Sequence, residues 1–137
     1  MIGETADHRK MSIELNHTII YAKNKQESAA FLADILGLDE PEPFGPFLVV
    51  KSANGVSLDF MTHSGSIDAQ HYAFLVAEAE FDAAFGRIKE RGLDYWADPA
   101  KKRRGEINKN DGGRGVYFHD PSGHFLEILT VPYGGWH

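Results

Sequence analysis

The strongest constraint on the fold is that the sequence repeats its own pattern. Residues 16–22 and 70–76 are both rich in side chains that favour β-strands. Each is followed by a segment, 25–36 and 80–91, in which apolar residues recur at helical spacing before a Gly-Leu pair. Two units therefore share the order of strand, helix and glycine stop, which indicates a tandem duplication.

The second half of each unit matches as well. Residues 55–61 (Gly-Val-Ser-Leu-Asp-Phe-Met) align with residues 123–129 (Gly-His-Phe-Leu-Glu-Ile-Leu), with short apolar stretches before each. Each unit thus predicts the order β-α-β-β-β, and the short strands near residues 42–44 and 94–96 are the weakest part of the pattern. We expect an α+β fold of two tandem βαβββ modules that form a cup-shaped mixed β-sheet with helices on the outside.

The expected boundaries follow from this pattern. Residues 1–10 are polar and predict a flexible extension, and residues 11–137 predict a single domain. Module one is expected at about 12–63 and module two at about 69–132. The second unit is longer because of a polar insertion at 99–113, for which we expect a mobile loop at the rim of the cup.

Four chemically reactive side chains occupy equivalent positions in the two units. His17 and His71 lie on the first strands, and Asp59 and Glu127 lie on the last. Because side chains alternate between the faces of a strand, all four are expected on the face opposite the apolar core. The other histidines have no such correspondence, and loop or surface roles are expected for His63, His119, His124 and His137.

A carboxylate inside an apolar strand is costly unless a cation neutralises it. Glu127 lies within Phe-Leu-Glu-Ile-Leu, and neither histidine strand contains Lys or Arg as an ion-pair partner. A lone strand histidine is more often a hydrogen-bonded residue than a ligand. Two equivalent histidines with two equivalent acids instead favour a divalent-metal site.

Composition excludes several classes of function. The 14 Lys and Arg against 20 Asp and Glu give a net charge of −6, which argues against nucleic acid as a partner. The basic run at 101–104 is flanked by acids and predicts a solvated loop. The absence of cysteine excludes disulfides and thiolate ligands. No apolar run is long enough for a membrane span, so we expect no membrane partner and a cytoplasmic location.

The chain also resembles a known family in particular motifs. Asn16-His17-Thr18-Ile19 with Leu36-Gly37-Leu38, and the stretch Asp-Pro-Ser-Gly-His-Phe-Leu-Glu-Ile at 120–128, are similar to the opening and closing signatures of the vicinal oxygen chelate superfamily, which includes glyoxalases, bleomycin resistance proteins and extradiol dioxygenases. The similarity covers about residues 13–132.

The resemblance implies a metal held by His17, His71 and Glu127, with Asp59 at the fourth metal-facing position. Glyoxalase I has Glu or Gln there, and the shorter Asp59 is expected to reach the ion through water, to act as a catalytic base beside it, or to do neither. The ion is expected to be zinc, nickel, iron, cobalt or manganese, with open positions for substrate oxygens.

Two classes of function remain open. The first is a glyoxalase-like metalloenzyme of lyase, isomerase or dioxygenase type that acts on a small molecule. The alternative is a metal-free binding protein of the bleomycin-resistance type. Arg114 and Tyr117 are the candidate substrate-binding residues, and Asn108 and Asn110 are weaker candidates.

A homodimer is the last expectation. A single βαβββ unit is an incomplete cup whose sheet edges need pairing or covering. The C-terminal segment at 131–136 contains Tyr133 and Trp136, residue types that are enriched at buried interfaces. The metal site could then lie within one chain or combine residues from two.

Overall fold

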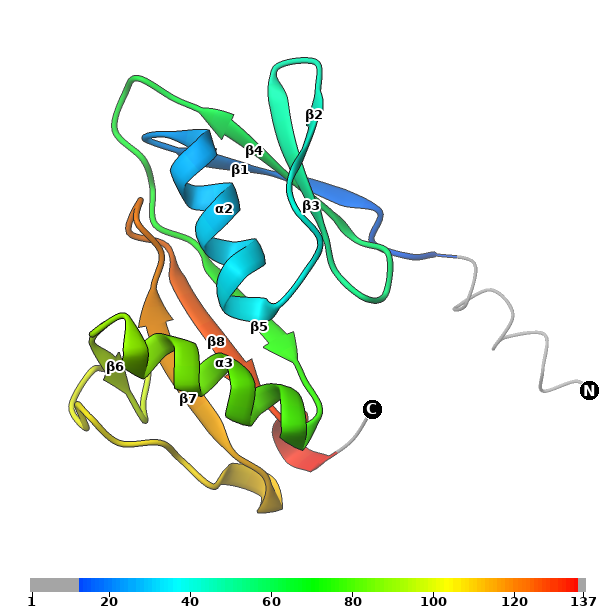
Figure 1. The fold of residues 1–137 in the computed structure, drawn as a ribbon. Helices are drawn as coiled ribbons and strands as arrows, with labels where there is room; N and C mark the ends of the chain where they lie inside the picture. Colours follow the sequence, from blue (N-terminus) through cyan, green and yellow to red (C-terminus); the bar gives the residue numbers. More distant parts are fainter. Residues whose placement is uncertain (1–12, 136–137) are drawn as a thin grey trace, which may run out of the picture.

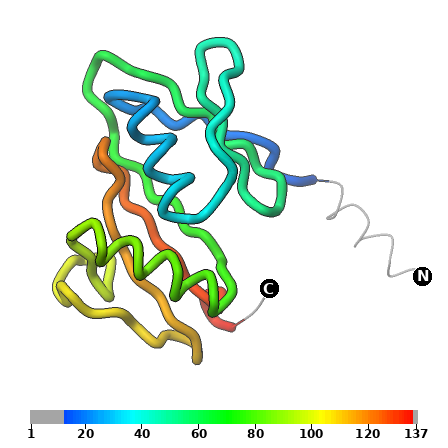
Figure 2. The backbone as a smooth tube through the Cα atoms, in the orientation of Figure 1, coloured from blue at the N-terminus to red at the C-terminus, as the bar shows by residue number. Residues whose placement is uncertain are grey.

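The computed structural model describes residues 13–135 of the chain. The predicted extension at 1–10 and the interface role of Trp136 lie outside the described residues. Module one contains β1 (His17–Ala22), helix α2 (Lys25–Leu36), β2 (Glu42–Phe44), β3 (Phe47–Lys51) and β4 (Ser57–Thr62). Module two contains β5 (His71–Leu75), helix α3 (Glu78–Glu90), β6 (Tyr95–Trp96), β7 (Gly115–His119) and β8 (Phe125–Leu129). Figures 1 and 2 show the two modules as separate bodies of sheet and helix that lie against one another.

Helix α2 has clear start and stop signals in the sequence. The side chain of Asn24 accepts a hydrogen bond from the backbone N–H of Glu27, which satisfies one of the free amides of the first turn. Gly37 ends the helix in the left-handed conformation with φ of 68°. The Gly-Leu stop predicted from the sequence is therefore confirmed for this helix.

Both sheets have the same topology and the same register. Module one has the strand order β1-β4-β3-β2 and module two the order β5-β8-β7-β6, each with one parallel and two antiparallel pairings. In module one Ile19 pairs with Asp59, and in module two Ala73 pairs with Glu127. The alignment of Asp59 with Glu127 inferred from the sequence therefore agrees with the strand register.

The predicted α+β fold of two tandem modules is confirmed, and so are the short strands β2 and β6. The expected cup could close within one chain or between two chains. Within residues 13–135 the two sheets are not joined by strand pairing, so β1 and β5 are edge strands of separate sheets.

The modules share one apolar core. Alternation along β1 buries Ile20 and Ala22 and leaves Ile19 and Tyr21 exposed, as the pattern predicts. The helices bring their apolar faces to the same core, where Phe81 of α3 and Ile128 of β8 are fully buried. The opposite faces of both sheets, which carry the candidate site residues, are not covered by these helices.

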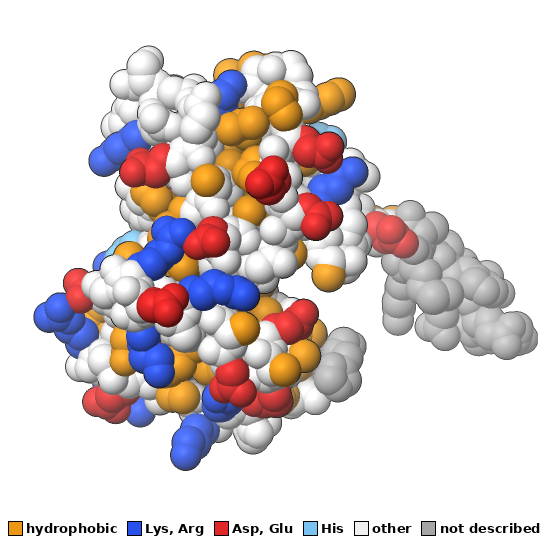
Figure 3. Space-filling view, viewed as in Figure 1, with side chains coloured by type: hydrophobic (Ala, Val, Ile, Leu, Met, Phe, Trp, Pro, Cys, Tyr) orange, Lys and Arg blue, Asp and Glu red, His pale blue; other side chains and the backbone are white. Residues whose placement is uncertain are grey.

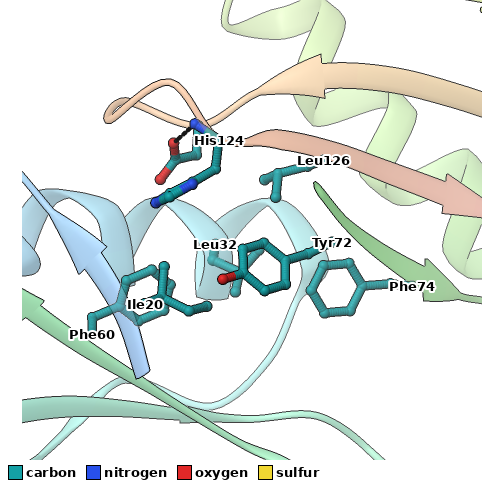
Figure 4. A pocket seen from close by; sticks show the side chains of 8 residues that line it. Ile20, Leu32, Phe60, Tyr72, Phe74, His124 and Leu126 are labelled. Carbon is teal, nitrogen blue, oxygen red and sulfur yellow. Dashed lines mark hydrogen bonds between the residues drawn. The ribbon is translucent and has the colours of Figure 1, made fainter. Parts of the chain in front are cut away.

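His124 connects the two modules at a polar point in this core. Its side chain is 2% exposed, its Nδ1 accepts from the N–H of Gln70 at 3.0 Å, and its Nε2 lies 2.7 Å from the carbonyl oxygen of Tyr21 in β1. Because Nδ1 accepts, Nε2 carries the proton and donates to Tyr21. Figure 4 shows the ring above Ile20 and Leu32 of module one and beside Leu126 of module two. His124 lies in the turn before β8, as one of the two expected roles has it, but a surface role is wrong. Its ring is buried, and its partners are backbone groups that only the tertiary fold brings together.

Charged side chains also meet along the junction of the modules. Arg91 pairs with Asp34, and Arg87 donates to the carbonyl oxygen of Ile35, so both residues link the end of α3 to α2. Figure 3 shows basic and acidic groups gathered on this face where the modules meet. Within the described part of the chain, no helix has the length and apolar character needed to cross a bilayer.

Candidate functional site

Module two brings His71 and Glu127 together on the open face of its sheet. The two residues lie on the parallel neighbours β5 and β8, and Nε2 of His71 is 3.1 Å from Oε1 of Glu127. Nδ1 of His71 is 2.9 Å from the carbonyl oxygen of Phe125, so the ring is held in one orientation with Nε2 toward the carboxylate. A histidine fixed through one ring nitrogen and presenting the other is the usual arrangement of a metal ligand.

The carboxylate of Glu127 is 1% exposed and lies in the middle of an apolar strand. Its other neighbours are tyrosines. The hydroxyl of Tyr133 donates to both carboxylate oxygens, at 2.6 and 2.7 Å, and lies 2.9 Å from the hydroxyl of Tyr117. Burial, followed by the hydrogen bond to Glu127, raises the pKa of Tyr133, and burial also raises the pKa of Tyr117. Both phenols are therefore neutral hydrogen-bonding groups at physiological pH.

Module one presents its equivalent residues differently. Nδ1 of His17 is 2.7 Å from the side-chain oxygen of Asn16, and the ring is exposed. Asp59 is 8% exposed and accepts a hydrogen bond of 2.5 Å from the hydroxyl of Ser57, its neighbour on the same strand face. The shorter Asp59 side chain thus has no contact with His17 like that between Glu127 and His71.

One copy of the chain does not assemble the full predicted ligand set. Within residues 13–135 no group of three or more His, Asp and Glu side chains is close enough to hold a metal ion. His71 and Glu127 meet, whereas His17 lies in the other module. The donors that do converge, one imidazole nitrogen and one carboxylate, fit a divalent ion and would provide two of its ligands.

Of the two predicted substrate-binding residues, Tyr117 lies at the site and Arg114 does not. Tyr117 pairs with Glu127 across β7 and β8, and its ring stacks on His71 with 5.9 Å between centroids. The guanidinium of Arg114 instead pairs with Glu78 and Asp82 of α3, both at 2.8 Å. The hydrogen bond to Asp82 raises the pKa of Arg114. The guanidinium is therefore charged and paired with the acidic residues of helix α3.

Aromatic rings line the sheet next to His71. We call Trp96, Tyr117, His119 and Phe125 the aromatic wall. The rings of Tyr117 and Phe125 stack at 5.4 Å, His119 lies 4.8 Å from Phe125, and Trp96 lies edge-on to His119 at 5.5 Å. A groove of about 630 Å³ opens beside the wall and shares Trp96 and His119 with it.

His119 was not identified as a site residue from the sequence, although alternation along β7 could have found it. It lies two residues beyond Tyr117, so both point to the face that carries Glu127. Its Nδ1 is buried and has no hydrogen-bond partner among the described residues. A buried ring nitrogen without a partner is unusual, because most buried polar atoms are hydrogen-bonded.

The insertion at 99–113 lies partly over the aromatic wall, as expected for a rim. The ammonium group of Lys101 is 5.3 Å from the ring of Trp96 and 5.1 Å from that of Phe125. Asn108, a weaker substrate candidate, is instead buried and donates to the carbonyl oxygen of Ala97 at 2.8 Å. Asn108 therefore fastens the loop to the module.

Comparisons with known proteins identify the family and the fold. The family model described as the glyoxalase/bleomycin resistance protein/dioxygenase superfamily matches residues 14–128. The solved structure of oxidase ChaP-H1 is 67% identical, covers 90% of this chain and 99% of its own, and superimposes with a TM-score of 0.88.

Two curated relatives are more distant. Glutathione transferase FosA of Serratia marcescens is 30% identical over 121 residues, which are 83% of this chain and 78% of that protein. Metallothiol transferase FosB of Shouchella clausii (strain KSM-K16) is 40% identical over 60 residues, which are 44% of this chain and only 37% of that protein. The relatives are enzymes of different types.

Proposed function

The chain belongs to the glyoxalase/bleomycin resistance protein/dioxygenase superfamily, and on this premise we propose that it is a metal-dependent enzyme of the oxidase or dioxygenase type. It binds one divalent ion through His71 and Glu127 of one chain and His17 of a second copy. Its substrate is a small aromatic molecule with adjacent oxygen atoms that coordinate the ion. Dioxygen is the oxidant.

The observation that carries the metal site is the contact between His71 and Glu127. A carboxylate that is 1% exposed among apolar strand residues requires a compensating charge. The imidazole beside it is already oriented by its bond to the carbonyl oxygen of Phe125. When bound there, a divalent ion would supply Lewis-acid chemistry to the substrate oxygens.

The third ligand is assigned to a second copy because, among residues 13–135, β1 and β5 are both edge strands of their sheets. Pairing β1 of one chain beside β5 of another would close an eight-stranded cup and bring His17 toward His71. The same association would bury the exposed apolar side chains of β1, Ile19 at 45% and Tyr21 at 46% exposure. A homodimer is thus part of the proposal.

The aromatic wall supports the substrate class. Flat rings at stacking distances favour an aromatic ligand, and the nearby cation of Lys101 favours one with a single negative charge or electron-rich ring. A glutathione-like substrate would need basic groups for its carboxylates. Arg114, the sequence candidate for that role, is instead neutralised by Glu78 and Asp82.

The metal and dimer proposals are tested by mixing two inactive variants. His17→Ala and Glu127→Ala homodimers are each expected to lose bound metal, measured by elemental analysis after reconstitution and desalting. If sites are shared, each hybrid dimer regains one intact site, so statistical mixing restores about a quarter of the wild-type metal content. Light scattering is expected to give a dimer mass. Hybrids without metal, or a monomer at tens of micromolar, would contradict the shared site.

Oxygen consumption tests the reaction type. Iron(II)-loaded protein is expected to consume dioxygen with ortho-dihydroxy aromatic compounds and not with glutathione conjugates. Trp96→Leu is expected to weaken binding of the aromatic compounds, and Phe44→Leu, at an exposed ring of β2, is the matched control. Turnover of a dicarbonyl or thiol substrate without oxygen would instead favour lyase or transferase chemistry. Tight binding without metal or turnover would favour the metal-free binding protein.

A further inference from the structure

The C-terminal turn places a phenol on the carboxylate that the proposed metal would use. Tyr133 lies in a short 3₁₀ turn, Tyr133–Gly135, that follows β8. Its hydroxyl oxygen is 2.6 Å from Oε1 and 2.7 Å from Oε2 of Glu127. The hydroxyl is nearly equidistant from the two carboxylate oxygens and so lies between them. A cation that a carboxylate binds with both oxygens occupies the same position.

The hydrogen bonds around this phenol have a defined direction. Tyr133 has one proton, and Glu127 receives it. The hydroxyl of Tyr117, 2.9 Å away, must therefore donate to the oxygen of Tyr133. The lone pairs of Glu127 between its two oxygens are thus occupied by a hydrogen bond, and the same lone pairs cannot serve a metal ion at the same time.

We propose that Tyr133 is a displaceable gate on the metal site, so that binding of a divalent ion to Glu127 expels the Tyr133 hydroxyl and moves the C-terminal turn. This inference rests on the proposed metal-binding function. It assigns to the C-terminal turn a role in controlling metal affinity that is separate from the ligand set itself.

The chain around Tyr133 is arranged to allow such movement. Before the turn, Thr130 is held on both sides by Arg114, since its hydroxyl accepts from the Arg114 N–H at 2.9 Å and its own N–H donates to the Arg114 carbonyl at 3.0 Å. Tyr133 itself is 52% exposed, and the following Gly134 and Gly135 both have φ of 73°. Hydrogen bonds therefore anchor the segment up to Thr130, and the two glycines allow the turn to pivot once the Tyr133 hydroxyl leaves Glu127.

Movement of the turn would also reach the rim of the site. The turn at Tyr133–Gly135 contacts the short 3₁₀ turn at Asn110–Gly112, which belongs to the insertion. The same insertion carries Lys101 over the aromatic wall. Release of Tyr133 would then be transmitted to the loop that carries Lys101.

Metal affinity of Tyr133→Phe tests the gate directly. The substitution removes the hydroxyl and keeps the ring, so it removes the competitor of the ion. Equilibrium dialysis of full-length protein against Mn²⁺ is expected to give a Kd about tenfold lower for the variant than for the wild type, as expected for loss of one hydrogen bond to a charged group. The matched control is Tyr95→Phe in β6, where the ring packs on Phe85 of helix α3, and this variant should leave the Kd unchanged.

Hydrogen exchange provides a second readout that does not depend on activity. The N–H of Gly135 donates to the carbonyl oxygen of Pro132 at 2.8 Å inside the turn. Addition of Mn²⁺ to the wild type is expected to raise exchange at residues 131–135 at least severalfold, and exchange in Tyr133→Phe should already be high without metal.

The outcomes separate the gate from the metal site itself. An equal or higher Kd in Tyr133→Phe, with Mn²⁺ still bound by the wild type, would overturn the gate and leave the metal proposal standing. No Mn²⁺ binding by either protein would overturn both. Unchanged exchange in the turn upon metal binding would also defeat the gate, because the hydroxyl would then have stayed on Glu127.

Discussion

Replacement of His124 by phenylalanine tests the junction that holds the two modules together. The ring is 2% exposed and serves one backbone donor, the Gln70 N–H, and one backbone acceptor, the Tyr21 carbonyl. Phenylalanine fills a similar volume but leaves both groups without this partner. Each unpaired buried polar group costs about 1–3 kcal/mol, and the new ring regains some apolar burial, so we expect a loss of about 3 kcal/mol.

Urea unfolding at a fixed protein concentration measures this loss. With a slope of about 1.5 kcal/mol per molar urea, the midpoint should fall by about 2 M. The concentration is held constant because an associating protein gains stability by mass action. His119→Phe is the matched control, because Nδ1 of His119 has no partner to lose, and its unfolding free energy should change by less than about 1 kcal/mol.

The refuting result is equally specific. A His124→Phe protein that unfolds within about 0.5 kcal/mol of the wild type, or no earlier than His119→Phe, would show that the two hydrogen bonds do not hold the junction. A large loss is also expected to weaken metal binding, since Gln70 immediately precedes His71 and Tyr21 lies on the strand that carries His17.

Two further predictions concern the C-terminal half. Gly113→Ala would place a Cβ 2.6 Å from Oγ1 of Thr130, so its thermal unfolding should occur about 5 °C or more below that of the wild type. The control is Gly86→Ala in helix α3, where the added Cβ meets no atom within 4 Å, and this substitution should be neutral or stabilising. The pKa values of Tyr117 and Tyr133 are raised in the folded protein, so their protonated hydroxyls stabilise the fold. This contribution to the free energy of unfolding is complete below the usual tyrosine pKa of about 10 and is lost as the pH rises above it. Ultraviolet titration of the folded protein should show that Tyr117 and Tyr133 ionise only above the usual tyrosine pKa of about 10. Complete ionisation of every tyrosine at or below that pH in the folded protein would contradict the hydrogen-bonded cluster.

The sequence by itself determined the repeated elements and their faces. The β-α-β-β-β order, the stop at Gly37 and the equivalence of Asp59 and Glu127 could be read from the pattern because helix and strand periodicity depend on neighbouring residues. The same periodicity placed His71 and Glu127 on one face of module two, where they are in contact.

Only the tertiary structure decided which residues meet across the repeat. His17 is equivalent to His71 in sequence, yet it lies apart from Glu127 because the two sheets are not paired within one chain. Arg114 was expected at the substrate, and the position of helix α3 gave it two carboxylate partners instead.

The contacts of Tyr133 and His124 could not be predicted from the sequence either. A tyrosine after the last strand and a histidine in a turn have no periodicity that reveals a partner. Their hydrogen bonds to Glu127 and to the backbone of Gln70 depend on how the C-terminal turn and the two modules pack. Local pattern sets the direction of each side chain, whereas long-range packing sets what it touches, and the chemistry of this protein depends on both.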